Sequence, residues 1–381
     1  MSEVIRVLRG PDRVRCRPAV IFGSDDNEGA QRAVEMLLGI MSSESMDDYS
    51  PSLIITLHDD GTIEMEDFGR GIYLGSDPDE RWKEIFCELY ARNRHEDYSL
   101  LGSDFSLFEE NNKVNAESFY ERYDEMTLCA VQYATEYMFV RIRRDGVEQE
   151  LHFKKGVNEG GLREVPYQGP SGTLIRFKLD GEVFTEPRIS SDFLSKQARR
   201  LALLIPGLKV HFNSPYPAEN HMTYCYSNGI ADYLGSEYAP LFLSKVEGKG
   251  QERYNLPRYT AELNIGLAFF KGAHYHEYYH NGRELIYGGA HISAIIEEIQ
   301  KRIEWVLGFY PSREELFANI CLVVVSKASR FATRWTNGSR RSIENVVLKD
   351  MGVDSIGDSF SKFIKDNGAI ISELFTQSTE R

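Results

Sequence analysis

The stretch EDFGRGI, Glu66 to Ile72, follows a strand-like run and places a carboxylate beside two glycines. The run before it, LIITLHDDGTIEM, has two apolar parts joined at Asp60-Gly61, a pattern that predicts a hairpin with a two-residue turn. An aspartate at a strand end can accept a hydrogen bond from a flat amino heterocycle, and glycines let the backbone approach closely. Asp67, Gly69 and Gly71 are therefore candidates for an adenine site, although the string also suits an ordinary turn.

The composition is that of a chain of 381 residues, 42% hydrophobic and 12% aromatic, which is enough for two domain-sized cores. No apolar run reaches the roughly 18 residues that span a bilayer, and the first residues lack a signal-peptide core. We therefore expect a cytoplasmic protein without a membrane segment. The five cysteines are scattered and include no CxxC pair, so neither a disulfide framework nor a zinc site is expected.

The net charge of −14 argues against a broad basic surface, because sequence-independent affinity for DNA comes from Lys and Arg at the phosphates. One basic cluster stands out in the sequence ATRWTNGSRR, with a further arginine just before it. Any DNA contact is expected to be local and to use the arginines of this loop, Arg330, Arg334, Arg340 and Arg341. The alternative is a solvated surface loop.

The hydrophobic pattern predicts two domains, residues 1–219 and 220–381, of the α+β class. In the first, the predicted helices are Glu28 to Met41, Asp79 to Asn93 and Ser191 to Leu204, and two strands, Tyr137 to Arg144 and Glu148 to Lys155, meet at Asp145-Gly146. A turn-rich segment, HFNSPYPAENH, contains this boundary. In the second, we expect strands Thr260 to Phe270, His274 to His280 and Ile320 to Val325, the helix Ala290 to Leu307 and a closing helical tail.

The order of these motifs resembles a known family, the N-terminal ATPase region of the B-subunit of DNA gyrase and its topoisomerase IV counterpart, in the GHKL superfamily. VLRGPDRVRCRPAVIFGS, Val7 to Ser24, is similar to the family's opening helix and Arg-x-Arg-Pro turn. GTLIRF, Gly172 to Phe177, resembles the strand after the nucleotide lid, and GGAH, Gly288 to His291, resembles a Gly-Gly-Thr-His element. The resemblance implies helices on a mixed sheet, followed by a ribosomal-S5-like α/β transducer domain.

The resemblance also implies that the adenine side of a nucleotide site is kept in part. Asp67 matches the carboxylate that binds the adenine amino group, and Thr173 matches the threonine beside it. Phe68 replaces an acidic residue and Tyr73 replaces a proline, so either ring could fill the pocket or stack on a ligand. The nucleotide-binding residues implied in this unit are Asp67, Arg70, Gly71, Ile72 and Thr173. The alternative is that Asp67 caps nearby backbone amides.

The phosphate side of that site is lost. The family's first helix carries a glutamate as general base and, four residues on, an asparagine that binds magnesium. Those positions are Met36 and Ile40, which can neither accept a proton from water nor bind a hard cation. Glu35 is one residue away, which on a helix rotates it about 100° from the required face.

Two further elements that handle phosphates also differ from the family. The glycine-rich lid corresponds to ERYDEMT, Glu121 to Thr127, which has no glycine and three carboxylates that would repel a triphosphate. The Gln-Thr-Lys loop of the transducer corresponds to Arg334-Trp335-Thr336, so the lysine is missing. Arg334 could supply a charge there, but with a different geometry.

From these losses we expect a stand-alone gyrase-B-like protein that acts by binding, with no catalytic residue, no metal site and no required cofactor. It would be a partner, modulator or dimeric scaffold in a DNA-topology or DNA-related system. Its partners would be a second copy of itself and a topoisomerase-like or other protein.

Two other hypotheses stay open. One is a divergent ATPase or nucleotide-gated clamp that binds ATP or ADP with Mg²⁺ and uses Glu35 or Glu44 as base. The other, an acidic DNA mimic, rests on the net charge alone. The C-terminal half has no EGDSA-like or DxD cluster, so DNA cleavage is not expected.

Overall fold

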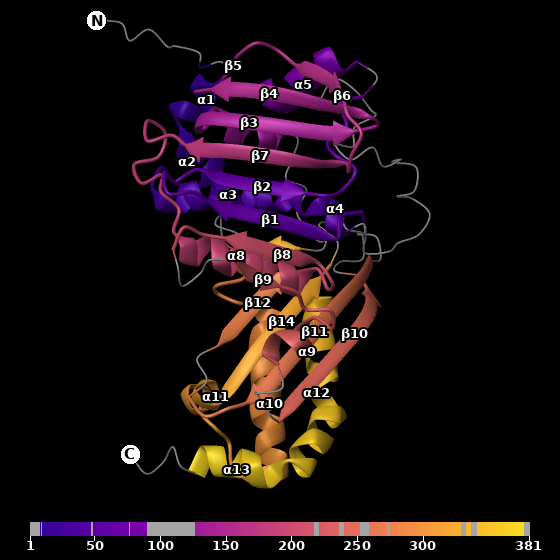
Figure 1. Cartoon of the computed structure of the whole chain (residues 1–381). Helices are drawn as coiled ribbons and strands as arrows, with labels where there is room; N and C mark the ends of the chain where they lie inside the picture. The colour runs from indigo at the N-terminus through magenta and orange to yellow at the C-terminus, as the bar shows by residue number, and fades with distance from the viewer. Residues whose placement is uncertain are drawn as a thin grey trace, which may run out of the picture. The chain divides into compact units, whose positions relative to one another are not determined.

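The computed structural model describes residues 8, 10–46, 49–75, 77–89, 126–216, 221–235, 240–251, 259–272, 275–328, 333–336 and 341–376. These residues form two compact units (Figure 1), which divide between Ser227 and Asn228. No helix within these ranges is long and apolar enough to cross a membrane. Each unit combines a sheet with helices, so the predicted α+β class is confirmed.

The first unit is built on a mixed sheet with nine strands among the described residues. The strand order is β5-β4-β3-β7-β2-β1-β8-β9, with β6 beside β4, and only the β1–β8 pair is parallel. The strands are β1 (Ser52–Leu57), β2 (Ile63–Asp67), β3 (Thr135–Arg144), β4 (Val147–Lys154), β5 (Val157–Asn158), β6 (Arg163–Pro166), β7 (Gly172–Leu179), β8 (Lys209–Asn213) and β9 (Met222–Tyr224). Because β9 pairs with β8, the first sheet extends beyond residue 219, where the sequence predicts the domain boundary.

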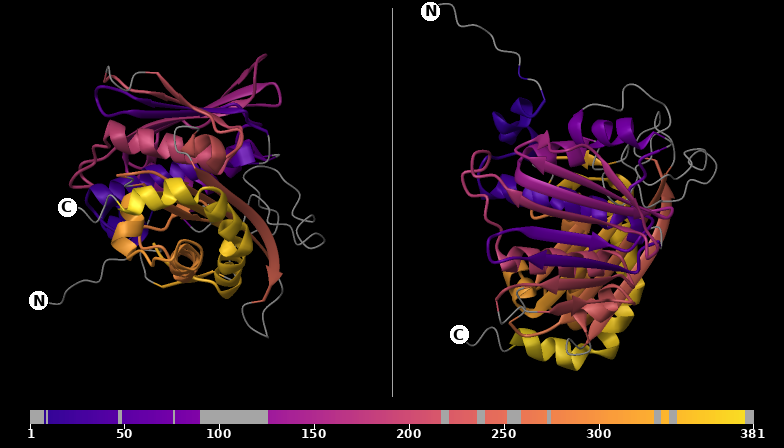
Figure 2. Two further views of the ribbon diagram at one scale, coloured as in Figure 1. Left: turned by 90° about the horizontal axis from the view of Figure 1, so that it is seen from below. Right: turned by 45° about the horizontal axis from the view of Figure 1, so that its top comes forward.

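Helices cover one face of this sheet, as the tilted view of Figure 2 shows. They are α1 (Asp12–Arg15), α2 (Pro18–Phe22), α3 (Asn27–Met41), α4 (Ser43–Met46), α5 (Pro78–Cys87), α7 (Met126–Tyr133) and α8 (Ser191–Leu204). Helices α3 and α8 begin at side-chain caps: Asp26 accepts the Glu28 amide at α3, and Ser190 accepts the Phe193 amide at α8. The predicted helices α3 and α8 are confirmed, whereas α5 ends at Cys87, before the predicted Asn93.

The hairpin between β3 and β4 has the predicted two-residue turn. Asp145 and Gly146 adopt positive φ angles of 51° and 83°. This is the backbone that a type I′ turn requires, and it explains the Asp-Gly pair.

The prediction of a two-residue turn at Asp60-Gly61 is wrong. β1 ends at Leu57 and β2 begins at Ile63, so five residues connect them. Asp60 accepts hydrogen bonds from the amide and the hydroxyl of Thr62, at 2.9 and 2.8 Å, and these local bonds stabilise a wider turn.

The second unit packs long helices against a sheet whose described strands follow the order β10-β11-β14-β12-β13, with only the β12–β14 pair parallel. The strands are β10 (Leu241–Gly250), β11 (Tyr259–Phe269), β12 (His276–His280), β13 (Arg283–Glu284) and β14 (Ile320–Lys327). The helices are α9 (Ile230–Leu234), α10 (Ala290–Leu307), α11 (Arg313–Asn319), α12 (Val346–Asp366) and α13 (Gly368–Thr376). The helix predicted over Ala290 to Leu307 is confirmed, and Gly308 ends it with a left-handed φ of 78°.

The core of the second unit lies between its sheet and α10 and α12. Ile295, Ile299 and Ile303 on α10 are fully buried, as are Phe360 and Ile364 on α12. Their spacing of four residues places them on one face of each helix, which is the apolar stripe that the sequence pattern predicts.

Gly266 lets α9 pack closely on β11. A Cβ at this position would lie 2.1 Å from Cγ2 of Ile230 and 2.9 Å from Cδ1 of Leu234. Both distances are shorter than real contacts between carbon atoms, so only glycine allows this packing.

We expect Gly266→Ala to lower the free energy of unfolding by about 1 to 3 kcal/mol, because the added methyl group overpacks the interface with α9. Chemical denaturation of the purified protein measures this. Gly181→Ala is the matched control, since a Cβ there would meet only Pro187, at 3.9 Å. Equal effects of the two substitutions would contradict the assignment.

Candidate functional site

Asp67 is the last residue of β2 and is almost fully buried, with 4% of its surface exposed. Its Oδ1 accepts a hydrogen bond of 2.8 Å from the Gly69 amide. Burial raises the pKa of Asp67 to about 7; the Gly69 amide opposes this rise, and the nearby Glu44 carboxylate adds to it. At neutral pH the carboxyl group is therefore shared between its charged and protonated forms.

The loop after Asp67 is held by hydrogen bonds to two other segments, the start of β7 and the end of β3. The Ser171 hydroxyl donates to the Gly69 carbonyl at 2.6 Å, and the Ile72 amide donates to the Thr173 hydroxyl at 3.1 Å. Nη1 of Arg144 donates to the Gly71 carbonyl at 2.8 Å. These contacts explain why the loop runs close to the ends of β7 and β3.

Two glycines permit that close approach. Gly71 has a φ of 81°, and a Cβ there would lie 2.8 Å from the carbonyl oxygen of Arg143. A Cβ on Gly172 would lie 2.2 Å from the carbonyl oxygen of Asp67. Both glycines are thus required by packing of backbone on backbone, whether or not a ligand binds.

A buried ion pair fixes Arg70, the central residue of the loop. The Glu44 carboxylate accepts bonds from the Arg70 amide, Nε and guanidinium, at 2.8, 3.1 and 2.9 Å. The side chain of Glu44 is only 4% exposed, and the guanidinium also stacks on the Tyr49 ring at 3.6 Å. Glu44 therefore serves as the partner of Arg70, a role that leaves little capacity for general-base catalysis.

The two aromatic residues that differ from the family pattern lie at the edge of this loop. Tyr73 is 38% exposed, and the Arg144 guanidinium lies 4.8 Å from the centre of its ring. Phe68 is partly buried, and its amide donates to the Ser50 hydroxyl at 3.1 Å. Arg144 is a site residue that sequence reasoning missed; its place before the Asp-Gly turn is the signal that marks it.

Helix α3 presents apolar side chains where the family has its base and metal ligand. Met36 is 6% exposed and belongs to the core, and Ile40 is partly buried. Glu35 pairs with Arg32 at 3.3 Å and with Arg200 of α8 at 3.6 Å. Within the described ranges, no three His, Cys, Asp or Glu side chains lie close enough together to hold a metal ion.

The remaining predicted residues lie elsewhere or outside the described part. Arg334 is on β15 (Arg334–Trp335) of the second unit, where it is 70% exposed and pairs with Glu344 at 3.2 Å. The Arg341 carbonyl accepts the Tyr287 amide at 3.1 Å. Outside the described residues lie Arg330, Arg340 and the lid stretch up to Glu125. The structure thus brings together Asp67, Arg70, Gly71, Ile72 and Thr173.

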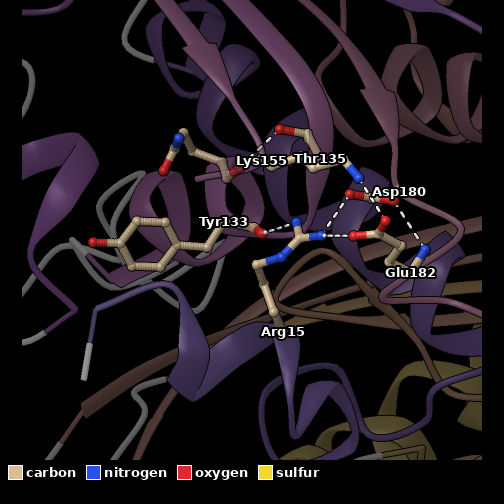
Figure 3. Close-up of polar contacts among 7 residues, drawn as sticks. Arg15, Tyr133, Thr135, Lys155, Asp180 and Glu182 are labelled. Carbon is tan, nitrogen blue, oxygen red and sulfur yellow. Dashed lines mark hydrogen bonds and ion pairs between the residues drawn. The ribbon is translucent and has the colours of Figure 1, made fainter. Parts of the chain in front are cut away.

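The Arg-x-Arg-Pro turn is anchored by a separate charge network (Figure 3). Arg15 donates to the Tyr133 carbonyl at 3.2 Å, to Asp180 at 2.7 Å and to Glu182 at 3.0 Å. Lys155 adds a bond of 2.6 Å to Glu182. Burial alone would raise the pKa of Asp180, but the Glu182 amide and the Arg15 guanidinium hold it below its ordinary value. This network ties α1 to α7 and to the end of β7.

Replacement of Asp67 by Asn should change how stability depends on pH. A carboxyl whose pKa rises on folding stabilises the folded state fully below its unfolded pKa, and this contribution falls as pH rises toward about 7. Relative to Asp67→Asn, the wild type should therefore lose up to about 1.4 kcal/mol per pH unit between pH 4 and 7. Denaturation curves across this range measure the difference. If the stability of the wild type and of Asp67→Asn changed with pH in the same way, the raised pKa of Asp67 would be contradicted.

Replacement of Arg70 by Ala should be strongly destabilising, by about 3 kcal/mol, because it leaves the buried Glu44 without its partner. The double variant Arg70→Ala/Glu44→Gln should regain part of that loss. Thermal and chemical denaturation measure both. Lys83→Ala, which breaks an exposed pair with Glu80, is the control and should cost less than about 1 kcal/mol.

Comparison with known proteins relates this geometry to bacterial topoisomerases. The chain is 26% identical over 303 residues to the B-subunit of DNA gyrase from Thermotoga maritima, covering 77% of this chain and 44% of that protein. It is 24% identical over 308 residues to the B-subunit of the type 2 topoisomerase from Aquifex aeolicus, covering 79% and 36%. The chain thus spans less than half the length of these relatives. No family model matches it.

Solved structures of the same kind of protein share the fold. The 43K ATPase domain of Thermus thermophilus gyrase B, solved with an aminocoumarin, has a TM-score of 0.66 and 20% identity, covering 99% of this chain and 96% of that one. The B-subunit of Myxococcus xanthus gyrase has a TM-score of 0.68 and 14% identity, covering 96% and 99%. The likeness to these structures confirms the overall fold that the sequence resemblance implies.

Proposed function

We propose, from the premise that this chain is a relative of the N-terminal ATPase and transducer region of the DNA gyrase B-subunit, that it acts by binding and does not hydrolyse ATP. In this proposal it is a partner, modulator or dimeric scaffold in a DNA-topology or DNA-related system. Its partners are a second copy of itself and a topoisomerase-like or other protein, and any DNA contact is made by the local basic loop that contains Arg334 and Arg341.

The observation that carries the proposal is the apolar character of α3 at the phosphate side. Hydrolysis needs a base for the attacking water and oxygen ligands for Mg²⁺. Met36 is packed in the core and Ile40 has no oxygen, so neither fits this chemistry. The nearest carboxylates on α3 and α4, Glu35 and Glu44, are engaged by Arg200 and Arg70. Magnesium and a triphosphate therefore do not fit the residues that the structure describes on this side of the site.

The adenine side of the site fits a ligand better than the phosphate side does. The Asp67 carboxyl can accept a hydrogen bond from an exocyclic amino group, and the Thr173 hydroxyl, which accepts from the Ile72 amide, keeps its own proton to donate. The Gly69 amide already donates a hydrogen bond to one oxygen of Asp67. Binding of a nucleotide through its base alone would lack the charge-assisted bonds that phosphates receive in a glycine-rich lid, so it should be weak.

The alternative function is a divergent ATPase or nucleotide-gated clamp that uses ATP or ADP with Mg²⁺. The retained pair of Asp67 and Thr173 favours it. It would require Glu35 or Glu44 to leave its arginine partner before either carboxylate could act as a base. The binding function needs no such rearrangement, which is why we prefer it.

We expect purified protein to show no Mg²⁺-dependent ATP hydrolysis above the level of Asp67→Asn, because no base or metal ligand is positioned among the described residues. A coupled phosphate-release assay measures this, and Asp60→Asn, in an exposed turn, is the control. Titration calorimetry with a non-hydrolysable ATP analogue should give little heat at millimolar ligand. Turnover that requires Mg²⁺ and disappears in Asp67→Asn would contradict the proposal and favour the clamp.

A further inference from the structure

The second unit carries a short hairpin that presents Arg334. We define the Arg334 hairpin as the described residues 333–336 and 341–345, which include β15 and β16 (Ile343–Glu344). Arg334 pairs with Glu344 and Trp335 with Ile343, and the Thr336 amide donates to the Ser342 carbonyl at 3.0 Å. So short a ladder is marginal in water by itself. Contacts with the rest of the unit must therefore hold it.

His280, the last residue of β12, holds the entrance of the hairpin. Its ring is completely buried, with Nδ1 3.0 Å from the Ser326 hydroxyl and Nε2 2.8 Å from the Thr333 hydroxyl. The Ser326 hydroxyl donates its single proton to the Tyr279 carbonyl, at 3.0 Å, so it accepts from Nδ1–H. Neutral His280 then has a free lone pair on Nε2, which accepts the proton of Thr333. The hydrogen bonds fix this tautomer.

The neighbouring residue reinforces the same junction. The Asn281 side chain accepts the Ala328 amide at 3.0 Å and donates to the Ala328 carbonyl at 2.8 Å. Ala328 directly follows β14, so both ends of the segment from 328 to 333 are fixed by consecutive residues of β12 and its turn. The Trp335 ring meets the edge of His280, with centroids 6.2 Å apart, and the Arg283 guanidinium lies 5.8 Å from it.

The exit of the hairpin is fixed as well. Ile343 is completely buried, and its carbonyl oxygen packs so closely on Gly289 that a Cβ there would lie 2.5 Å away. Asn345 caps α12 by accepting the Leu348 amide at 2.8 Å and donates to the Tyr259 hydroxyl at 2.9 Å. The hairpin is thus held at both ends by buried polar groups.

We propose that His280 is a positioning residue, whose bond to Thr333 holds the Arg334 hairpin in one place and so presents the exposed Arg334 guanidinium to DNA phosphates. This rests on the local DNA contact proposed above. A neutral imidazole can donate to Ser326 through one ring nitrogen and accept from Thr333 through the other. Burial lowers the pKa of His280 to about 3, with the neighbouring His291 as a second cause, so the arrangement holds throughout the physiological range.

Hydrogen exchange tests the positioning role without DNA. Thr333→Val removes the partner of Nε2 and should speed exchange of the Thr336 and Glu344 amides, which lie in the hairpin ladder, about tenfold, with β11 unchanged. His280→Leu should do the same. Thr223→Val is the matched control, because it breaks an exposed hydrogen bond to His211 in the first unit. Unchanged hairpin exchange in both variants would overturn the proposal.

Binding of a short DNA duplex tests the consequence. Thr333→Val should weaken DNA binding by the same factor as Arg334→Ala. The double variant should bind no more weakly than either single variant, because both substitutions remove the same contact between Arg334 and a phosphate. Fully additive losses would show that His280 and Thr333 do not act through Arg334. If the wild type binds no duplex at about 50 mM salt, where phosphate contacts are strong, the DNA contact fails, while hydrogen exchange still decides whether His280 fixes the hairpin.

Discussion

The candidate site depends on the contact of backbone with backbone at the ends of β2, β7 and β3. Gly172 lies against the carbonyl of Asp67, and Gly71 lies against the carbonyl of Arg143, at distances that no side chain could tolerate. This proximity excludes water from Asp67 and raises its pKa. The carboxyl group, the loop and the charge of Arg70 all follow from how closely these three strand ends meet.

Polar side chains that are buried or partly buried hold three of the segments beside the sheets. Glu44 fixes the Arg70 loop, Arg15 fixes the turn before α2, and His280 fixes the Arg334 hairpin. In each case one side chain makes hydrogen bonds to several groups, and a buried polar group without a partner would be costly. Such contacts support the fold independently of any ligand, because the loops need them whether or not one binds.

Part of the structure could be predicted from local sequence. The Asp145-Gly146 turn and the helix from Ala290 to Leu307 are correct because each depends on neighbouring residues, a pair suited to positive φ and an apolar stripe of helical period. The same reasoning fails at Asp60-Gly61, where Thr62 competes for the aspartate and widens the turn. The partners of Glu35 and Arg70 were not predictable, since Arg200 and Glu44 are distant in sequence and join them only after folding.

By itself the sequence determined the α+β class, the residues that gather around Asp67 and the apolar side chain at Met36, because periodicity, turn chemistry and residue type are local properties. Only the tertiary structure decided that Gly71 is needed for packing, that Glu44 and Glu35 are occupied by arginines, and that His280 supports the Arg334 hairpin. The physical reason is that burial and hydrogen-bond partners arise between segments far apart in the chain. Burial and hydrogen-bond partners determine the pKa of a carboxyl group and whether a charged side chain is already paired, and neither can be read from residue type alone.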